Sequence, residues 1–302
     1  MTAESALVYV RPMPLAAPVA ALLDQFHERR PVRVSSLIIT LYGDSIVPRG
    51  GILWLGSLIE IMAHFRIDAA HVRTAMSRLT HDRWLMREKL GRNSYYGLTL
   101  AGEDSFGAAT QRIYFSERKP ESLRLALLGP GVADRAKVRP QLARAGFAQL
   151  SPTVYVAAGT PYVSIDGVFV FDVPADINAR RMAAAVWKLA PIAEAYRGFI
   201  GRFTPLDAAL AESSDAPTPE DALVARTLLI HEFRRIVLRD PGLPASLLPR
   251  DWPEPEARAL AARIYRRVAA AADEVFWGSH QPSGPLPPPN ASAAVRFSDV
   301  VQ

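Results

Sequence analysis

The 302-residue sequence contains no cysteine. Disulfide frameworks, thiolate zinc sites and cysteine nucleophiles are therefore excluded, and a reducing cytoplasm is the expected location. The sequence also lacks a run of apolar residues as long as a membrane span, and its N-terminus lacks the ordered regions of a secretory signal. We therefore expect a cytoplasmic protein that makes no membrane contact.

Motifs of common enzymes are missing as well. None of the six histidines belongs to a metal-binding pair of the HExxH type, and there is no GxxxxGKS/T phosphate loop and no serine nucleophile elbow. At 49% hydrophobic content, 302 residues are nevertheless enough for two or three domains. These observations predict a multidomain protein that is not an enzyme and needs no metal or cofactor.

Positive charge is concentrated in one short region. The whole chain carries a formal charge of +5, and residues 66–99 contain seven Lys or Arg against three Asp or Glu, which leaves +4 there. This region reads "RIDAAHVRTAMSRLTHDRWLMREKLGRNSYYGLT". A local excess of this kind indicates an anionic partner more specifically than the overall balance does.

Three helices are predicted ahead of and within this region. Apolar residues recur at helical spacing in residues 34–46 and again in residues 52–67, with Pro48, Gly50 and Gly51 between the two stretches. Asp68 is the expected N-cap of a third helix, whose Val72, Met76 and Leu79 share one face. The segments "WLMREKL" and "YYGLTL" flank the turn "GRNS" and predict a β-hairpin. Three helices followed by a hairpin predict a winged helix-turn-helix.

The outward face of the third helix is small, polar and basic. Such a face lets a helix enter the major groove of DNA, while a basic hairpin turn contacts the flanking backbone. The alternative interpretation is a solvated helix face without a partner. The residues that we predict to contact DNA are His71, Arg73, Thr74, Ser77, Arg78, Lys89, Arg92 and Asn93.

The rest of the chain predicts two further domains of an α+β protein. The order strand, helix, strand, strand, helix between residues 122 and 203 indicates a central α+β domain, and helical patterns predominate beyond it. From Gly278 the composition is rich in Pro, Ser and Ala and predicts a mobile tail. The expected divisions are an extension (1–32), a winged helix (33–115), the central domain (116–206), a helical domain (207–277) and a disordered tail (278–302).

Two segments resemble the PaaX family of repressors of phenylacetate-degradation operons. They are "VRTAMSRLTHDRWLMREKLGRNSYYGLT" and, near the C-terminus, "HEFRRIVLRDPGLPASLLPRDWP". The resemblance implies a ferredoxin-like central domain and a homodimer that binds palindromic operator DNA. It also implies release from the operator by an aryl-CoA thioester such as phenylacetyl-CoA. The chain departs from the family's pattern at Arg83, where a glycine is usual, and at Gly97, where a basic residue is common.

The C-terminal motif suggests where such a thioester binds. On this interpretation arginines meet the CoA phosphates and an aromatic side chain packs on the acyl ring. The alternative is that the arginines pair with Asp240 and Asp251 and only brace the proline-rich connection. The predicted ligand-binding residues are Arg234, Arg235, Arg239, Trp252 and Tyr265.

Two other functions remain open. Winged helices also serve as protein-docking adaptors, since fold alone does not fix function. The central domain also resembles small CRISPR-associated endoribonucleases, which hold a metal ion with an aspartate at the end of the first strand. Here that strand ends "LALLGPG" without a carboxylate, and Asp172 is expected to be a turn or cap residue. The metal-dependent nuclease is therefore the weakest of the three hypotheses.

Overall fold

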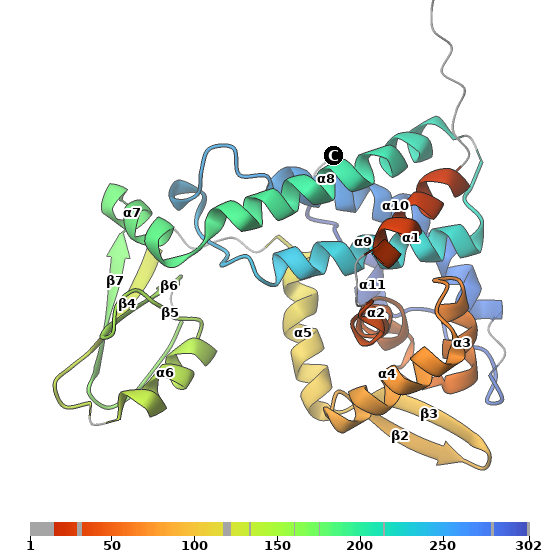
Figure 1. Cartoon of the computed structure of the whole chain (residues 1–302), viewed down its shortest axis with the longest axis horizontal. Helices are drawn as coiled ribbons and strands as arrows, with labels where there is room; N and C mark the ends of the chain where they lie inside the picture. Colours follow the sequence, from red (N-terminus) through yellow and green to blue (C-terminus); the bar gives the residue numbers. More distant parts are fainter. Residues whose placement is uncertain are drawn as a thin grey trace, which may run out of the picture. The chain divides into compact units, whose positions relative to one another are not determined.

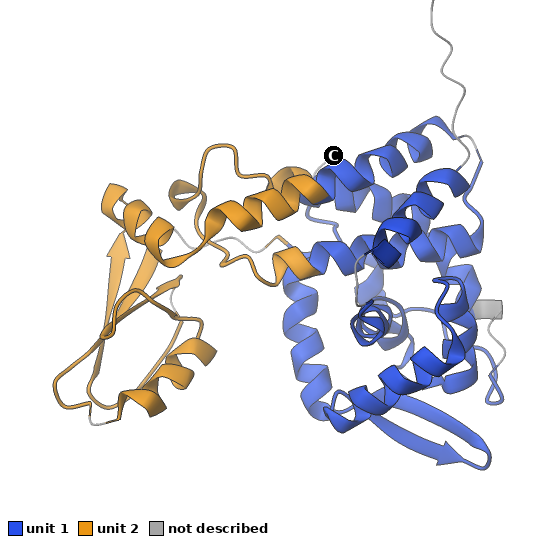
Figure 2. Ribbon diagram, viewed as in Figure 1, with its two compact units in different colours: residues 1–115, 199–234, 257–302 blue, residues 116–198, 235–256 orange. Residues whose placement is uncertain are grey.

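The protein combines helices with two small antiparallel sheets in a computed structural model. The structure describes residues 15–28, 32–116, 122–132, 134–159, 161–174, 176–213, 215–278 and 281–300. The chain divides into two compact units (Figure 2), of which unit 1 comprises 1–115, 199–234 and 257–302, and unit 2 comprises 116–198 and 235–256. These units interleave along the sequence, so the sequential domain boundaries given above stay a prediction.

Unit 1 begins with helices whose buried stripes follow the sequence pattern. They are α1 (Ala16–Glu28), α2 (Val34–Leu41), α3 (Leu55–Ala63) and α4 (Ala69–His81). Leu37, Ile38 and Leu41 of α2 have no exposed surface, and Val72 and Met76 of α4 are at most 1% exposed. The predicted helical stretches and their buried faces are therefore confirmed for α2 and α4.

The link from α2 to α3 contains more regular structure than Pro48, Gly50 and Gly51 in its sequence indicated. It contains a π-helical turn (Tyr42–Ile46), a 3-10 turn (Val47–Arg49) and the strand β1 (Leu53–Trp54). We expected residues 52–54 to open a helix, but Leu53 and Trp54 pair instead with the hairpin, opposite Tyr96 and Tyr95. A two-residue strand lies below the length at which alternation is visible in a sequence.

The predicted hairpin is present as β2 (Leu85–Leu90) and β3 (Asn93–Leu98). Its antiparallel register runs from Leu85 opposite Leu98 to Leu90 opposite Asn93, so Gly91 and Arg92 form the turn. Gly91 has a φ of +61°, a conformation that glycine adopts without steric cost. The sheet order is β1-β3-β2, and Figure 1 shows α4 beside the hairpin.

Arg83 lies in the turn between α4 and β2 with a φ of +60°. The related family usually has a glycine at this position, and the left-handed backbone, which only glycine adopts without steric cost, gives the physical reason. A non-glycine residue there costs about 1–2 kcal/mol, of which the larger freedom of glycine in the unfolded chain offsets part. We therefore predict that Arg83→Gly raises the free energy of unfolding by about 0.5–1 kcal/mol. Urea denaturation measures this change, with Arg83→Ala as the control that should bring no gain.

Long helices complete unit 1. α5 (Leu100–Tyr114) follows the hairpin, and the later helices are α8 (Leu189–Glu212), α9 (Pro219–Val237) and α10 (Glu254–Gly278), parts of which belong to unit 1. A polar stretch of sequence between Glu212 and Pro219 separates α8 from α9. Among the described residues, no helix is both long enough and apolar enough to cross a bilayer.

The C-terminal segment corrects the prediction of a disordered tail within residues 281–300. A short helix, α11 (Ala291–Ala294), precedes Arg296 and Phe297, which are 6% and 0% exposed. The Phe297 ring packs edge-on against Tyr114, with ring centroids 5.4 Å apart. Composition suggested disorder because Pro, Ser and Ala predominate, yet one aromatic and one arginine anchor the segment. Residues 279–280 and 301–302 of the predicted tail lie outside the described part.

Unit 2 is built on a four-stranded antiparallel sheet of order β5-β6-β4-β7. Its elements are β4 (Ser122–Leu128), α6 (Arg135–Arg144), β5 (Ala148–Gln149), β6 (Val154–Ala158), β7 (Val168–Pro174) and α7 (Ile177–Val186). The expected order of strand, helix, two strands and helix is therefore present, with β5 added. The last helix of this order ends as α7 at Trp187, whose backbone is extended, and α8 begins two residues later. Trp187 packs against the apolar core of unit 2, which fixes the break.

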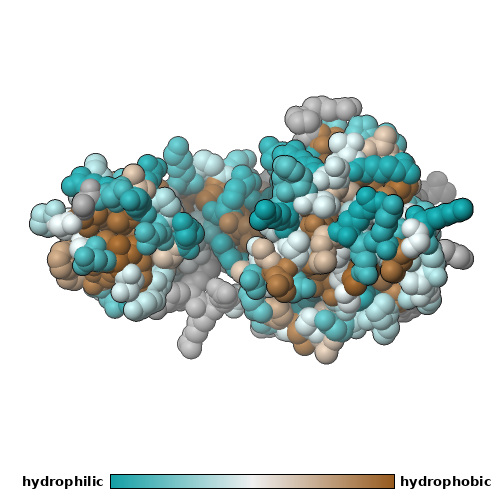
Figure 3. All heavy atoms as spheres, turned by 90° about the horizontal axis from the view of Figure 1, so that it is seen from below, coloured by the Kyte–Doolittle hydropathy of each residue, from teal (hydrophilic) through white to brown (hydrophobic). Residues whose placement is uncertain are grey.

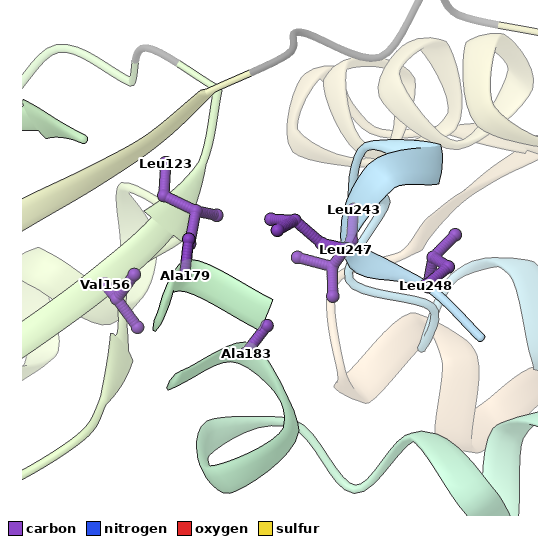
Figure 4. Close-up of a cluster of buried hydrophobic side chains, with 7 residues drawn as sticks. All are labelled: Leu123, Val156, Ala179, Ala183, Leu243, Leu247 and Leu248. Carbon is purple, nitrogen blue, oxygen red and sulfur yellow. The ribbon is translucent and has the colours of Figure 1, made fainter. Parts of the chain in front are cut away.

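The connection between α9 and α10 covers part of this sheet. Leu243, Leu247 and Leu248 from the connection form one buried cluster with Leu123 of β4 and Ala183 of α7. Figure 4 shows Leu243 and Leu247 of the connection turned toward α7, which carries Ala179 and Ala183. A short 3-10 turn (Ala245–Leu247) gives the proline-rich stretch the regularity that its composition did not indicate.

Asp172 lies within β7 and is not a turn or cap residue. Its carboxylate accepts hydrogen bonds from Arg124 of the neighbouring strand β4, at 2.7 Å from Nε and 3.1 Å from Nη2. The hydrogen bonds from Arg124 lower the pKa of Asp172 below its ordinary value. Asp172 therefore has a cross-strand structural partner.

Candidate nucleic-acid interface

Helix α4 is fixed in unit 1 by its cap and by its apolar face. The Asp68 carboxylate accepts a hydrogen bond from the backbone N–H of His71 at 2.9 Å, as expected of the N-cap. Hydrogen bonds from the backbone and side chain of His71 lower the pKa of Asp68, so the carboxylate stays charged at neutral pH. Val72, Met76 and Leu79 are buried, which turns the opposite face outward.

The predicted residues of α4 all lie on that outward face. They are His71, Arg73, Thr74, Ser77 and Arg78, and each is exposed. The side chains of Arg73 and Arg78 therefore project from the helix, and Arg78 lies only 3.6 Å from Asp82 in an exposed, easily broken pair. The structure thus brings the five side chains together on one surface without assigning them a partner.

Two of these side chains have local hydrogen bonds that limit what they offer. His71 Nδ1 lies 2.8 Å from the Asp68 carboxylate, so Nε2 is the ring nitrogen left for another partner while that contact lasts. The Thr74 hydroxyl donates to the carbonyl of Ala70 at 2.9 Å. A hydroxyl that donates in this way still accepts, and its methyl group still faces outward.

The hairpin places a second basic group beside α4. Lys89 and Arg92 are exposed, and Asn93 is half-buried at the start of β3. Arg87 is a further basic residue of the hairpin that was not among the predicted contacts, and its guanidinium donates to the Ser94 hydroxyl across the hairpin at 2.8 Å from Nη2. Arg87 and Lys89 alternate with Glu88 along β2, and that period of two was the available signal. Figure 3 shows hydrophilic side chains over much of this face of unit 1.

The predicted ligand-binding residues do not form one cluster within either unit. Arg234 belongs to unit 1 and donates from Nε to the Thr40 hydroxyl at 2.7 Å and from Nη2 to the Ser36 carbonyl at 2.8 Å. Tyr265, also in unit 1, donates to Asp44 at 3.1 Å. Arg234 thus ties α9 to α2, and its structural role is clear.

The other three predicted ligand residues belong to unit 2. Arg239 donates to the carbonyl of Arg235 at 2.6 Å. Trp252 packs edge-on against Tyr196 with ring centroids 6.1 Å apart, and its buried Nε1 has no hydrogen-bond partner among the described residues. Of the carboxylates named in the bracing alternative, Asp251 pairs with Arg197 at 2.8 Å.

Asp240 is the second carboxylate of the bracing alternative. It accepts a hydrogen bond from the Tyr196 hydroxyl at 3.0 Å. Its second oxygen accepts from the backbone N–H of Gly242 at 2.8 Å. Within the described residues, no group of three or more His, Asp or Glu side chains is arranged to hold a metal ion.

Comparisons with known proteins identify the family. The family model described as PaaX-like protein matches residues 33–102, and the model of the PaaX-like protein C-terminal domain matches residues 187–278. The transcriptional repressor PaaX of Escherichia coli K12 is 36% identical over 286 residues, which cover 88% of this chain and 90% of that protein.

A solved structure of an uncharacterized protein from Mycobacterium tuberculosis is also similar. It is 21% identical, with 72% of this chain and 90% of that chain covered, at a TM-score of 0.42 that supports no conclusion about the fold. The kinship with the E. coli repressor confirms the predicted class, a transcriptional regulator that is not an enzyme. The chain belongs to the PaaX family.

Proposed function

We propose that the protein is a cytoplasmic repressor that binds operator DNA through a winged helix-turn-helix formed by α2, α3, α4 and the β2–β3 hairpin. In this proposal α4 enters the major groove and the hairpin is the wing. Arg73, Thr74, Ser77 and Arg78 approach base edges and nearby phosphates, with His71 at the helix start. Lys89, Arg92 and Asn93 contact the backbone or the minor groove.

One observation carries this proposal. The outward face of α4 presents two arginines, Arg73 and Arg78, with Thr74 and Ser77 between them in sequence, and the basic turn of the hairpin belongs to the same unit. Small side chains allow a helix to approach base edges closely, whereas bulky ones would hold it away. A solvated helix face would require neither the small residues nor the adjacent basic turn.

We further propose that the protein acts as a homodimer. A winged helix that reads a palindromic operator does so in two copies, with half-sites about one helical turn or more apart. The central sheet, which we assign to a ferredoxin-like domain, is the candidate dimerisation element. Its β4 is flanked by β6 and β7, as expected of such a fold, although α7 follows β7 instead of preceding it.

The regulated genes and the effector follow from the family. The target is an operon for the degradation of an aromatic acid of the phenylacetate type, and an aryl-CoA thioester such as phenylacetyl-CoA relieves repression. Of the five residues predicted to bind it, Arg235, Arg239 and Trp252 of unit 2 are the candidate contacts, because Arg234 and Tyr265 are held by partners within unit 1. Nε1 of Trp252 has no hydrogen-bond partner within the described part of the chain, which supports a role for that side chain. The thioester changes operator affinity only to the extent that it binds the two states of the dimer unequally.

Fluorescence anisotropy with DNA from upstream of the protein's own operon tests the proposal. We expect selective binding of this DNA over a scrambled duplex, and release on addition of phenylacetyl-CoA. Selective binding that ignores the thioester would exclude phenylacetyl-CoA as effector and retain the DNA function. Equal binding of both duplexes would contradict the repressor and favour an adaptor role for the winged helix.

A further inference from the structure

A buried cluster of arginines and aspartates lies in unit 1 and shares no residue with the predicted interface. Asp44, which follows α2, has no exposed side-chain surface and pairs with Arg226 at 2.7 Å and Arg296 at 3.1 Å. Asp273 of α10 pairs with Arg49 at 2.7 Å and with Arg226 at 2.5 Å. Two carboxylates thus face three arginines, which leaves the cluster with a net positive charge.

A cavity of about 420 Å³ adjoins this cluster, and all five charged residues line it. A sixth charged residue, Arg266, also lines the cavity and adds another positive charge. Much of the remaining wall consists of small side chains, namely Pro289, Ala291, Ala293 and Ala294 of the C-terminal segment and Ala269 of α10. Sites for small molecules commonly enclose about 300–1,000 Å³, so the volume suits a compact ligand.

Two of the arginines that line the cavity have buried side-chain nitrogens without a hydrogen-bond partner among the described residues. The side chain of Arg49 is 1% exposed, and its Nε has no hydrogen-bond partner among the described residues. Its Nη2 is close to Asp273 without the geometry of a hydrogen bond, and Nε of Arg296 is also unpartnered in the described structure. Burial lowers the pKa of Arg49, and the carboxylate of Asp273 only partly offsets this effect. A buried cation in this condition is stabilised by an additional anion.

We propose that this cavity binds a small organic oxyanion, a carboxylate or phosphate group on a compact body. The oxyanion neutralises the excess charge of Arg49, Arg296 and Arg266, since guanidinium groups match both kinds of group geometrically. The body of the ligand lies against the alanines of α10 and of the C-terminal segment. This segment, residues 289–296, therefore forms one wall of a binding site.

The cavity is connected to the proposed wing through the backbone. Arg49 belongs to the link between α2 and β1, and β1 pairs with β3 of the hairpin. In the same link, the Tyr42 hydroxyl donates to the carbonyl of Tyr96 in β3 at 3.2 Å, and the Pro48 carbonyl accepts from the N–H of Asn290 at 2.8 Å. A ligand that draws Arg49 toward it thereby displaces the base of the wing. This coupling rests on the proposed DNA function, whereas ligand binding itself does not.

Thermal unfolding and titration calorimetry of the full-length protein with benzoate, inorganic phosphate and coenzyme A test the site. We expect at least one of these probes to raise the Tm saturably and to bind with measurable heat. Ala269→Leu, which fills the cavity without removing a charged group, should weaken that binding about fivefold or more, because overpacking costs about 1–3 kcal/mol. Ala270→Leu is the matched control on the exposed side of α10 and should change the affinity less than twofold.

Three results would overturn the assignment. They are the absence of binding by all three probes, equal affinity in the wild-type and Ala269→Leu proteins, and an equal loss in Ala270→Leu. Arg49→Lys gives a second readout, because it keeps the charge but loses the planar fork and should also weaken binding. Operator binding is measured separately without any probe. The wild-type protein could bind a probe, with the expected weakening in Ala269→Leu, and yet show no preference for operator DNA. That result would refute the proposed DNA function but would support the ligand site.

Discussion

Asp44→Asn is expected to lower the free energy of unfolding by about 3–5 kcal/mol, because removal of one partner leaves buried charges uncompensated. The Asp44 carboxylate is central to the packing of unit 1. It accepts hydrogen bonds from two guanidinium groups, at 2.7 Å from Nε of Arg226 and at 3.1 Å from Nη1 of Arg296. It also accepts from three hydroxyls, those of Tyr114 at 2.7 Å, Tyr265 at 3.1 Å and Ser45 at 2.9 Å. An asparagine keeps the shape but supplies only one acceptor oxygen and no charge.

Urea denaturation measures this loss, and an exposed pair supplies the control. Asp24 is 2.6 Å from Arg66, but both side chains are more than half exposed. Exposed pairs of this kind contribute about 0–1 kcal/mol, so Asp24→Asn should have little effect. Equal destabilisation by the two substitutions would show that the buried cluster does not stabilise the fold.

The same carboxylate predicts a dependence of stability on acid. Burial alone raises the pKa of Asp44, but Arg226, Arg296 and the hydroxyl of Tyr114 together outweigh it, and the pKa lies below its ordinary value. Its contribution is therefore complete above the unfolded pKa of about 3.9 and is lost as the pH falls through the lower folded pKa. We expect Asp44→Asn to flatten the decline in stability below about pH 4. An identical acid profile in the variant and the wild type would contradict this origin.

Arg78→Ala is expected to weaken operator binding by about 1–3 kcal/mol and to relax sequence preference, if its guanidinium contacts a base bidentately. Arg78 is exposed near the C-terminal end of α4, and its pair with Asp82 is too weak to hold it from DNA. Lys89→Ala should instead weaken binding to all sequences alike. It should also make the slope of log affinity against log salt concentration shallower by about one, because one phosphate contact is lost.

Competition anisotropy with the operator and with single-base variants distinguishes these two effects. Arg139→Ala, on the exposed surface of α6 in unit 2, is the control for a general loss of positive charge. If Arg78→Ala and Arg139→Ala behave alike, the recognition role of α4 is wrong. Each variant should unfold at the same urea concentration as the wild type, since exposed substitutions change stability by less than about 0.5 kcal/mol.

The parts of the fold that are specified locally were predictable. The stripe of Val72, Met76 and Leu79 and the N-cap at Asp68 are set by neighbouring residues, and so is the hairpin turn at Gly91. The outward face of α4 then follows from its inward face. This is why every predicted DNA-contact residue of the helix is exposed in the structure.

Features that depend on distant partners were not predictable in this way. Leu53 becomes a strand residue only because Tyr96 lies opposite it, and Phe297 orders the C-terminal segment only because Tyr114 and Tyr265 receive it. The wall of the cavity likewise depends on a contact between Asp44 and Arg296, which are 252 positions apart in sequence. A single sequence shows the charged residues but does not show which of them pair.

A salt titration of operator binding tests the central claim most directly. The upstream DNA and a scrambled duplex are compared by anisotropy from low to high salt. We predict that the affinity falls log-linearly with a slope of about −5 or steeper, because several phosphates are contacted, while the preference for the upstream sequence persists. Affinity that hardly changes with salt, or no preference at any salt, would contradict a DNA-binding repressor.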